Sequence, residues 1–499
     1  MYVAQQGFAP DADISSEGVW TDCDLLIPTL RGFESLPGDT YAGAATVSGS
    51  AVMSAKAFTH LDGSVRLLAG TGDSASSGSA NLYEVTVSSL TSRNGAGAPY
   101  TASAAARWTF AQYNDIVLAS QKGTQMLQSA SPSSDFTAIS GAPQAVAVVT
   151  ALDFAVAFNT TDALFGDSPN RWWCCAAGDV TDWVPDVATQ ATSGLLTQSL
   201  GEVIAASVVG DDIVAFSPNV ALLGQYVGTP EVWRWTVVAG EGLGAHSSHS
   251  VVDVEGVGLL WPGKDNFYLF DGSRATPIGT NRVAQSFLTD LDTAFAKLIV
   301  GFHERNKSRV FWWYPSLGGG LGNGTLDRFL CYNYRVSTWG FGRKTVAFPL
   351  SASAVGLTFD DLGAAYATWD ALPALSYDTA FAPAGMPVPS FFDTSGALVN
   401  MNGTSSTSYF TTGGIGADGV VSALSRVRPR FQKVPTSGVL EHAYANILGE
   451  TWRVSGSTTM QRGVFDHVFA SRWHRLKHTF TGTVELGGID VEIRAESTE

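Results

Sequence analysis

The chain has 499 residues, 29 of them basic and 45 acidic, which gives a net charge of −16 at pH 7. This net negative charge argues against a protein that binds the phosphate backbone of a nucleic acid over a broad surface. It is compatible with the wall of a channel through which a polyanion passes without being bound. No apolar run reaches the ~18 residues that a membrane helix requires, so we expect no membrane span.

The composition favours an all-β chain. Glycine (53 residues) and aromatic residues (14 Trp, 14 Tyr and 27 Phe) favour pleated strands and tight turns over helices. Charged residues make up only 15% of the chain, which leaves a neutral surface that suits burial against partner subunits. The length allows at least two domains, each with its own core.

Residues 1–18 (MYVAQQGFAPDADISSEG) contain neither a basic start nor an apolar core, so we expect no secretory signal in the N-terminal region 1–45. We interpret residues 1–45 as an extended segment and docking region. The four cysteines, Cys23, Cys174, Cys175 and Cys331, lie too far apart for metal-ligand spacing, and the adjacent pair would point to opposite faces of a strand. We expect buried thiols in a reducing compartment.

A short cassette recurs along the middle of the chain. Residues 254–279 (VEGVGLLWPGKDNFYLFDGSRATPIG) contain two apolar runs joined by a turn and followed by an Asp-Gly turn. Similar apolar runs begin at Ile116, Phe154, Ile213, Val257 and Val310. Their spacing brackets the ~40 to 50 residues of one propeller blade. The pattern predicts a β-propeller of about six blades over residues 46–395.

Two of these cassettes align without a gap. Residues 154, 175, 180 and 183 match residues 310, 331, 336 and 339, each at an offset of 156, and the cysteine, valine and closing tryptophan are the same in both. A constant offset across two strands and a loop indicates the same supersecondary unit, repeated three or four blades later.

One helix is predicted near 281–295, where Val283, Phe287, Leu288, Leu291 and Phe295 recur at helical spacing. Residues 362–392 are rich in Pro and Ala, and we interpret them as a linker or as a last, irregular blade. Clear alternation returns in residues 396–499, with strands expected at 424–431, 441–448, 452–456, 472–480 and 483–495. Strands at this spacing predict a small β-sandwich-like domain.

The strand at 424–431 carries Arg426, Arg428 and Arg430 on one face, while Val427, Pro429 and Phe431 fall on the other. We predict that this arginine strand contacts a neighbouring subunit.

The search for catalytic chemistry is mostly negative, and we expect no catalytic residue, no cofactor, no metal and no enzyme. The chain lacks a G-x-S-x-G elbow, an H-E-x-x-H helix and a Walker loop. The glycine runs at 240–244 and 318–324 fit hairpin loops better than phosphate-binding loops.

Two groups of histidines are candidate sites. His246 and His249 could bind a metal ion or could be polar loop residues, and we favour the loop interpretation. His467, His474 and His478 could form a pH-sensitive or phosphate-contacting patch, and we favour a solvated edge or a subunit contact.

Acidic pairs raise the alternative of glycoside cleavage. They are Asp11 with Asp13, Asp211 with Asp212, and Asp360 with Asp361. Aspartates in turns usually accept backbone hydrogen bonds, which is the interpretation we favour. Three tryptophan pairs could stack sugars: Trp172 with Trp173, Trp233 with Trp235, and Trp312 with Trp313. Their place in the cassettes makes core and blade-interface roles our expectation.

Several segments carry a family resemblance in their order along the chain. They are residues 7–18 (GFAPDADISSEG), 25–38 (LLIPTLRGFESLPG), the cassette at 254–279, residues 408–416 (SYFTTGGIG), the Arg-x-Arg-Pro strand, and residues 471–496 (SRWHRLKHTFTGTVELGGIDVEIRAE). Together they resemble the tail nozzle proteins of short-tailed bacteriophages, also described as tail tubular protein B or packaged-DNA stabilisation proteins.

The resemblance implies a virion protein made in the cytoplasm of a bacterial host. It implies a hexameric ring docked on a tail adaptor protein, where it continues the DNA channel, retains packaged DNA and supports receptor-binding fibres or spikes. Double-stranded DNA would pass through without sequence recognition. The alternative is a propeller-type carbohydrate-binding or carbohydrate-cleaving protein. The loosely spaced middle cassettes and the Pro-rich 362–392 depart from the family pattern, so the blade count stays open.

Overall fold

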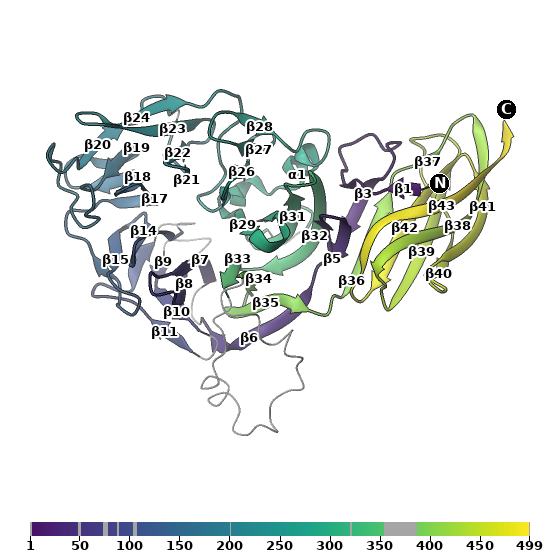
Figure 1. Ribbon diagram of the computed structural model, residues 1–499, viewed down its shortest axis with the longest axis horizontal. Coiled ribbons are helices and arrows are strands. Elements are labelled where there is room, and N and C mark those ends of the chain that lie inside the picture. Colours follow the sequence, from purple (N-terminus) through teal and green to yellow (C-terminus); the bar gives the residue numbers. More distant parts are fainter. Residues whose placement is uncertain are drawn as a thin grey trace, which may run out of the picture.

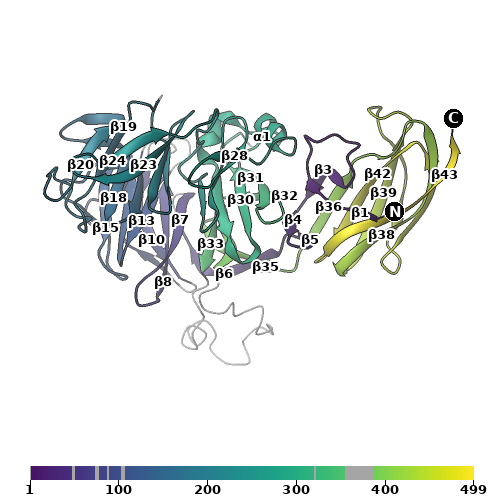
Figure 2. The ribbon, with the colours of Figure 1, turned by 45° about the horizontal axis from the view of Figure 1, so that its top comes forward.

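The computed structural model describes residues 2–47, 51–72, 78–86, 89–102, 107–199, 201–319, 322–353 and 387–498. These residues fold almost entirely into β-strands, arranged as two bodies side by side (Figures 1 and 2). The larger body is a β-propeller, which confirms the predicted fold class. The smaller body contains both ends of the chain.

Six four-stranded antiparallel sheets form separate blades. Five follow in chain order: β7 (Ala51–Thr59), β8 (Val65–Gly72), β10 (Leu82–Val85) and β11 (Leu90–Ser92); β13 (Thr109–Tyr113), β14 (Ile116–Gln121), β15 (Thr124–Ser129) and β16 (Thr137–Ala138); β17 (Gln144–Ala151), β18 (Phe154–Asp162), β19 (Gly166–Cys174) and β20 (Thr192–Leu195); β21 (Ala205–Val209), β22 (Asp212–Phe216), β23 (Ala221–Gly228) and β24 (Val232–Val237); β25 (Val252–Val254), β26 (Gly258–Pro262), β27 (Phe267–Phe270) and β28 (Ala275–Pro277). A two-stranded sheet of β9 (Gly78–Ala80) and β12 (Tyr100–Ala102) accompanies the first blade.

The sixth separate blade joins distant parts of the chain. It consists of β33 (Phe348–Ser353), β34 (Pro387–Phe392), β35 (Ala397–Gly403) and β6 (Gly38–Thr46). Strand β6 comes from the N-terminal region and pairs antiparallel with β35, so the start of the chain closes the ring. The propeller therefore extends over β6 and β35, beyond the predicted limits of 46 and 395. Of the Pro-rich 362–392, residues 387–392 form β34 and the rest lies outside the described residues.

A further four-stranded arrangement completes the ring between the β25–β28 blade and the closing blade. It consists of β29 (Val300–Glu304), β30 (Arg309–Tyr314), β31 (Leu326–Asn333) and β32 (Thr338–Val346), and its sheet continues into the second body. The first strands β7, β13, β17, β21, β25, β29 and β33 contact one another in this order, and β33 returns to β7. The ring thus has seven positions, six of them occupied by separate sheets.

The predicted cassettes all begin at equivalent places. Ile116, Phe154, Ile213, Val257 and Val310 lie in or next to the second strands β14, β18, β22, β26 and β30. These strands are almost completely buried, as in β26 and β30, where every residue is buried. Strands β18 and β30 are three positions apart, which accounts for the constant offset of 156 residues.

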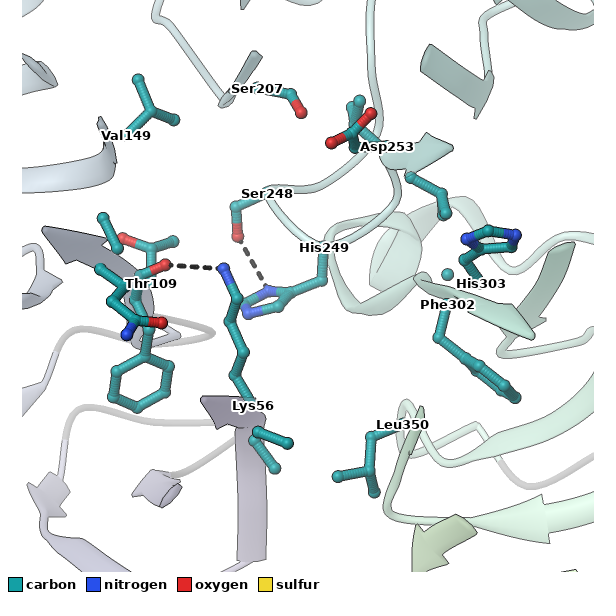
Figure 3. A pocket seen from close by; sticks show the side chains of 18 of the residues that line it. Lys56, Thr109, Val149, Ser207, Ser248, His249, Asp253, Phe302, His303 and Leu350 are labelled. Carbon is teal, nitrogen blue, oxygen red and sulfur yellow. Dashed lines mark hydrogen bonds between the residues drawn. The ribbon is translucent and has the colours of Figure 1, made fainter. Parts of the chain in front are cut away.

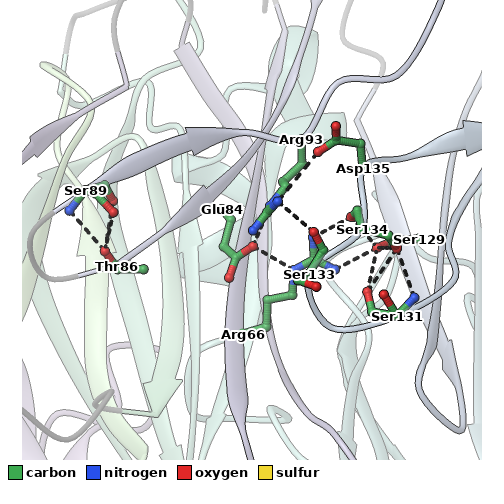
Figure 4. Close-up of polar contacts among 10 residues, drawn as sticks. All are labelled: Arg66, Glu84, Thr86, Ser89, Arg93, Ser129, Ser131, Ser133, Ser134 and Asp135. Carbon is green, nitrogen blue, oxygen red and sulfur yellow. Dashed lines mark hydrogen bonds and ion pairs between the residues drawn. The ribbon is translucent and has the colours of Figure 1, made fainter.

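A polar cluster ties the first two blades together (Figure 4). The buried Arg66 and the neighbouring Arg93 both bind the Glu84 carboxylate, at 3.0 and 2.7 Å. Arg66 also donates to the Ser129 hydroxyl at 2.8 Å, which lies on the second blade. Charge-assisted bonds of this kind fix the relative position of two sheets more specifically than apolar packing does.

The predicted helix is divided in two. Helix α1 (Ala284–Asp290) buries Ala284 and Phe287, and the 3-10 helix η1 (Thr293–Leu298) follows it. Asp292 separates them because its side chain accepts a hydrogen bond from the Ala294 N–H and caps the second segment. A second 3-10 turn, η2 (Arg305–Lys307), joins β29 to β30.

The second body combines both ends of the chain. Its C-terminal strands are β36 (Thr407–Thr412), β37 (Ile415–Gly416), β38 (Val420–Lys433), β39 (Ser437–Ala445), β40 (Arg453–Thr459), β41 (Phe465–Ser471), β42 (Trp473–Thr481) and β43 (Glu485–Thr498). One layer runs β40-β39-β42-β36-β3, and the other contains β41, β38 and β43. Leu424, Leu440, Phe465, Leu476 and Phe480 are among the buried residues between the layers.

The N-terminal residues form five short strands rather than one extended segment. They are β1 (Tyr2–Ala4), β2 (Gly7–Phe8), β3 (Val19–Asp24), β4 (Leu26–Thr29) and β5 (Gly32–Ser35). β1 and β5 pair with β43, and β3 pairs with β36. β2 and β4 pair with β32 of the propeller, so one hydrogen-bonded sheet crosses from one body to the other. Gly340 allows this contact, because a Cβ there would lie 2.5 Å from the Leu26 carbonyl oxygen.

Candidate functional site

The propeller encloses a cavity of about 740 Å³ around its axis (Figure 3). All seven first strands contribute to its wall, together with the segment that leads into β25. Parallel first strands place their alternate side chains toward the axis, so the cavity lining is set by every second residue of these strands.

Lys56 and Asp253 are the charged side chains of the axial cavity. Lys56 extends inward from β7, and Asp253 stands across from it on β25 (Figure 3). The Lys56 ammonium donates to the Phe110 carbonyl oxygen at 3.2 Å. Loss of hydration lowers the pKa of Lys56 and raises that of Asp253, and the attraction between the two charges partly offsets both shifts. Within the described residues, the Asp253 carboxylate has no hydrogen bond or ion pair.

Two histidines of the cavity wall are neutral near pH 7. Burial, assisted by the Arg107 charge, lowers the pKa of His249 to about 3, and its Nδ1 lies 3.0 Å from the Ser248 hydroxyl. Burial lowers the pKa of His303 to about 4, and its Nε2 lies 3.1 Å from the Tyr334 hydroxyl. Neither ring therefore adds a charge that competes with Lys56 or Asp253.

Hydrogen bonds cross the ring at the end of the axial cavity where the first strands begin. Arg107, which precedes β13, donates to the Leu298 carbonyl oxygen at 2.9 Å, and Leu298 precedes β29 on the far side of the ring. The segment 247–250 is held beside this bond, because the Gly301 N–H donates to the His249 carbonyl oxygen at 2.8 Å and the Trp312 indole to that of Ser250 at 3.0 Å. These bonds link opposite sides of the ring at one end of the axial cavity.

His246 and His249 do not converge on one point. His246 is buried, with its Nε2 at 3.0 Å from the Gly263 carbonyl oxygen, whereas His249 faces the axial cavity. No group of three His, Cys, Asp or Glu side chains suited to a metal ion occurs among the described residues. The loop interpretation of AHSSHS fits these separate contacts.

The chemistry that the cavity wall offers is binding through charge and hydrogen bonds. A glycosidase of the usual kind requires two carboxylates flanking the bond, and sialidases use a tyrosine nucleophile. The lining residues contain a single carboxylate, Asp253, and no tyrosine or arginine.

The arginine strand is β38, and its alternation is as predicted. Val427 and Pro429 are buried, whereas Arg428 and Arg430 are exposed. Arg426 binds Asp466 at 2.6 Å, and Arg430 binds Asp490 through two bonds of 2.9 Å and lies 4.0 Å from the Tyr2 ring. Within the described residues, Arg428 alone of the three has no ion pair. Two of the predicted contact arginines are therefore engaged inside the chain.

The C-terminal histidines lie in the core of the second body rather than at a solvated edge. His474 and His478 are fully buried on β42, and His442 on β39 is buried beside them. His442 Nε2 lies 2.9 Å from His474 Nδ1, and the half-buried His467 approaches the Ser455 hydroxyl at 3.1 Å. The sequence analysis grouped His467, His474 and His478 but missed His442 and the burial of this cluster, although His442, His474 and His478 share the inward phase of Leu440 and Leu476.

The remaining candidates have structural roles. Asp11 accepts from the Gln285 and Ser286 backbone N–H groups at 2.7 and 3.0 Å, and Asp13 accepts from the Ser15 N–H. Asp212 accepts from the Gln225 amide, Asp211 is exposed in a turn, and Asp360 and Asp361 lie outside the described residues. Trp172, Trp173, Trp233, Trp312 and Trp313 are buried, and Trp235 is half-buried 5.9 Å from Trp172.

No helix among the described residues has the length and apolar character needed to cross a membrane.

No family model matches this chain, and no curated protein matches its sequence. Solved structures of similar fold include YCF48 from Cyanidioschyzon merolae, with 10% identity and a TM-score of 0.33 over 72% of this chain and 98% of that chain. BamB from Moraxella catarrhalis has 8% identity and a TM-score of 0.37 over 76% and 93%. An exo-β-1,3-galactanase from Phanerochaete chrysosporium has 8% identity and a TM-score of 0.28 over 89% and 100%.

The prediction that the chain is not an enzyme is contradicted by this finding. An exo-β-1,3-galactanase is among the structures of similar fold, so the propeller gives no ground for excluding catalysis. The prediction rested on missing sequence motifs, and such motifs do not register carboxylates that are brought together from separate blades.

Proposed function

We propose that this protein is a structural subunit of the tail of a short-tailed bacteriophage, similar to the nozzle proteins that its sequence resembles. In this role it assembles into a ring below the portal and adaptor, continues the DNA channel and supports fibres or spikes.

The proposal is supported chiefly by the way in which the resembling segments fit together. Residues 7–18 and 25–38 contribute β2, β4 and β5, and residues 408–416 and 471–496 contribute β36, β37, β42 and β43. In the second body β5 pairs with β43, and β36 and β37 pair with β42. β2 and β4 also pair with β32, so the segments that carry the resemblance form one continuous unit with the propeller.

The physical properties of the chain suit a part that is present in many copies. Six blades have their edges confined within a closed ring, which limits uncontrolled pairing between copies. A net charge of −16 suits a channel wall that must release a moving polyanion. Cyclic assembly requires contacts between two different faces, and the two unlike bodies of this chain offer them.

Electron microscopy of the purified chain and of virions carrying it tests the proposal. We expect closed rings of the purified protein and gold-labelled antibody at the distal end of the tail. Protein that stays monomeric with its tail adaptor present, and that is absent from purified virions, would overturn the proposal.

A second candidate function is carbohydrate recognition or cleavage at the axial cavity. The observation that favours it is the pocket itself, which is lined by Thr59, Thr150, Ser207 and Ser351 along with its charged groups. A glycan array followed by an assay for released sugar tests this candidate. Binding that is lost when cavity residues are changed supports it, and an array without any bound glycan counts against it.

A further inference from the structure

We propose that the axial cavity binds a small, hydroxyl-bearing ligand that carries both an anionic and a cationic group, such as an amino sugar phosphate. The proposal deepens the second candidate function, on which it rests, by naming the chemical class of the ligand.

Lys56 supplies the site for the anionic group. Its ammonium has three N–H donors, and the structure assigns one of them to the Phe110 carbonyl oxygen. No carboxylate binds it within the described residues, and its side chain is exposed within the cavity. Two donors therefore remain for an anion that enters the cavity.

Asp253 supplies the site for the cationic group. It lies on β25, three positions around the ring from β7, so the wall separates the two charges instead of pairing them. Its carboxylate accepts no hydrogen bond within the described residues. Lys56 and Asp253 are both exposed within the cavity, so a ligand with two opposite charges can reach both side chains and pair with each of them.

The rest of the wall suits hydroxyl groups. The side chains of Thr59, Ser207 and Ser351 line the cavity, and none of these three hydroxyls has a hydrogen bond within the described residues. His249 and His303 are neutral, so they accept or donate single hydrogen bonds without selecting a net charge. The cavity volume of about 740 Å³ admits a phosphorylated monosaccharide and falls within the range of small-molecule sites.

Titration calorimetry on the full chain with three related probes tests the charge requirement. Glucosamine 6-phosphate carries both charges, glucose 6-phosphate only the anion, and glucosamine only the cation. We expect the first probe to bind about tenfold more tightly than either of the others. Equal affinities for the three probes, or no heat from any of them at about 10 mM, would overturn the inference.

Two variants locate the binding. Lys56→Met should reduce the affinity for glucosamine 6-phosphate to that for glucosamine, and Asp253→Asn should reduce it to that for glucose 6-phosphate. Lys433→Met and Asp211→Asn, at exposed positions outside the cavity, are the matched controls. Thermal unfolding checks that each variant is folded. Binding of glucosamine 6-phosphate that neither cavity variant changes would place the ligand elsewhere and refute the proposal.

The outcomes of these experiments distinguish the two-charge ligand from the second candidate function, which is carbohydrate recognition at the axial cavity. A neutral glycan that binds in the array, loses affinity on Ser207→Ala and is unaffected by Asp253→Asn would retain carbohydrate recognition and refute the two-charge ligand. If no glycan on the array binds but glucosamine 6-phosphate binds tightly, the proposed ligand site is supported and glycan recognition is refuted.

Discussion

His442 Nε2 lies 2.9 Å from His474 Nδ1 in the core of the second body, and both rings are fully buried. His474 continues the chain of hydrogen bonds to Ser422, and His442 continues it to Ser455. One ring must donate and the other accept, so at least one of the two imidazoles must be neutral. Burial, with the neighbouring His474 and His467, lowers the pKa of His442 to about 3.

We expect the second body to lose stability as the pH falls below about 6.5, the usual pKa of an unfolded histidine. The folded pKa of His442 is lower, so the unfolded chain binds more protons between about 6.5 and about 3. Stability is therefore complete above this window and declines within it. Tryptophan fluorescence during denaturant unfolding, followed through Trp452 and Trp473 at several pH values, measures the effect. A free energy of unfolding that stays constant from pH 7 to pH 4.5 would contradict it.

His478→Phe should stabilise the protein, and most strongly in acid. The His478 ring is buried, it stacks on Phe410 at 4.6 Å, and neither of its nitrogens has a hydrogen-bond partner. Removing buried unsatisfied groups should add about 1 to 3 kcal/mol to the free energy of unfolding. His467→Phe is the control, because that half-buried ring is hydrogen-bonded to Ser455 and should lose stability instead. The free energy of unfolding of both variants, measured with denaturant at two pH values, tests this prediction. A lower free energy of unfolding for His478→Phe than for the unsubstituted protein would contradict it.

Arg309→Met should destabilise the protein by about 3 to 5 kcal/mol, because it leaves the buried Glu304 carboxylate without its partner and removes one of the two cations that bind the half-buried Glu34. Arg309 is 1% exposed and binds Glu304 at 2.6 Å and Glu34 at 2.8 Å. The Glu34 bond also attaches β5 to the propeller. Arg234→Met removes an exposed pair with Glu231 and should change stability by no more than about 1 kcal/mol. Similar unfolding midpoints for the two variants would show that the buried pair has no such role.

Gly38→Ala should loosen the closing blade. A Cβ at Gly38 would lie 2.0 Å from the Thr404 carbonyl oxygen, so β6 must move away from β35. We expect a loss of about 1 to 3 kcal/mol and faster cleavage near β35 in limited proteolysis. At Gly419 a Cβ would meet no atom within 4 Å, and Gly419→Ala should leave both measurements unchanged. Equal proteolysis of the two variants would refute this account of ring closure.

Arg428→Glu should weaken ring assembly if the arginine strand contacts an acidic neighbour. Arg428 is exposed on β38, and no ion pair within the described residues occupies it. The substitution should therefore reduce the assembled fraction in sedimentation without lowering the melting temperature. Arg462→Glu, on the exposed turn between β40 and β41, makes the same charge change as a control. Sedimentation that is unchanged by Arg428→Glu would exclude this strand from the subunit contact.

The sequence predicts the second strands of five successive blades because these strands are buried on both faces. A strand such as β26 then appears as an uninterrupted apolar run that ends at turn residues. The first blade was not predicted from such a run, because Arg66 interrupts the apolar residues of its second strand, β8. The closing blade was not predicted for another reason, because β6 and β35 are far apart along the chain.

The axial cavity could not be predicted in the same way. Lys56 and Asp253 are single charged residues in short alternating strands, a pattern that surface positions share. Their proximity arises only when the ring closes. The histidine cluster could have been placed inside, because strict alternation in β42 puts His474 and His478 in phase with Leu476 and Phe480.

Strand β32 belongs to both bodies, which has a mechanical consequence. A flexible linker would let the two bodies move independently. Hydrogen bonds from β32 to β2 and β4 instead hold the two bodies in a fixed relative orientation. A force on the second body is transmitted through these backbone bonds to the propeller wall. Any rearrangement of an assembly built from this chain would thus proceed by tilting whole subunits against one another, with each subunit keeping its own shape.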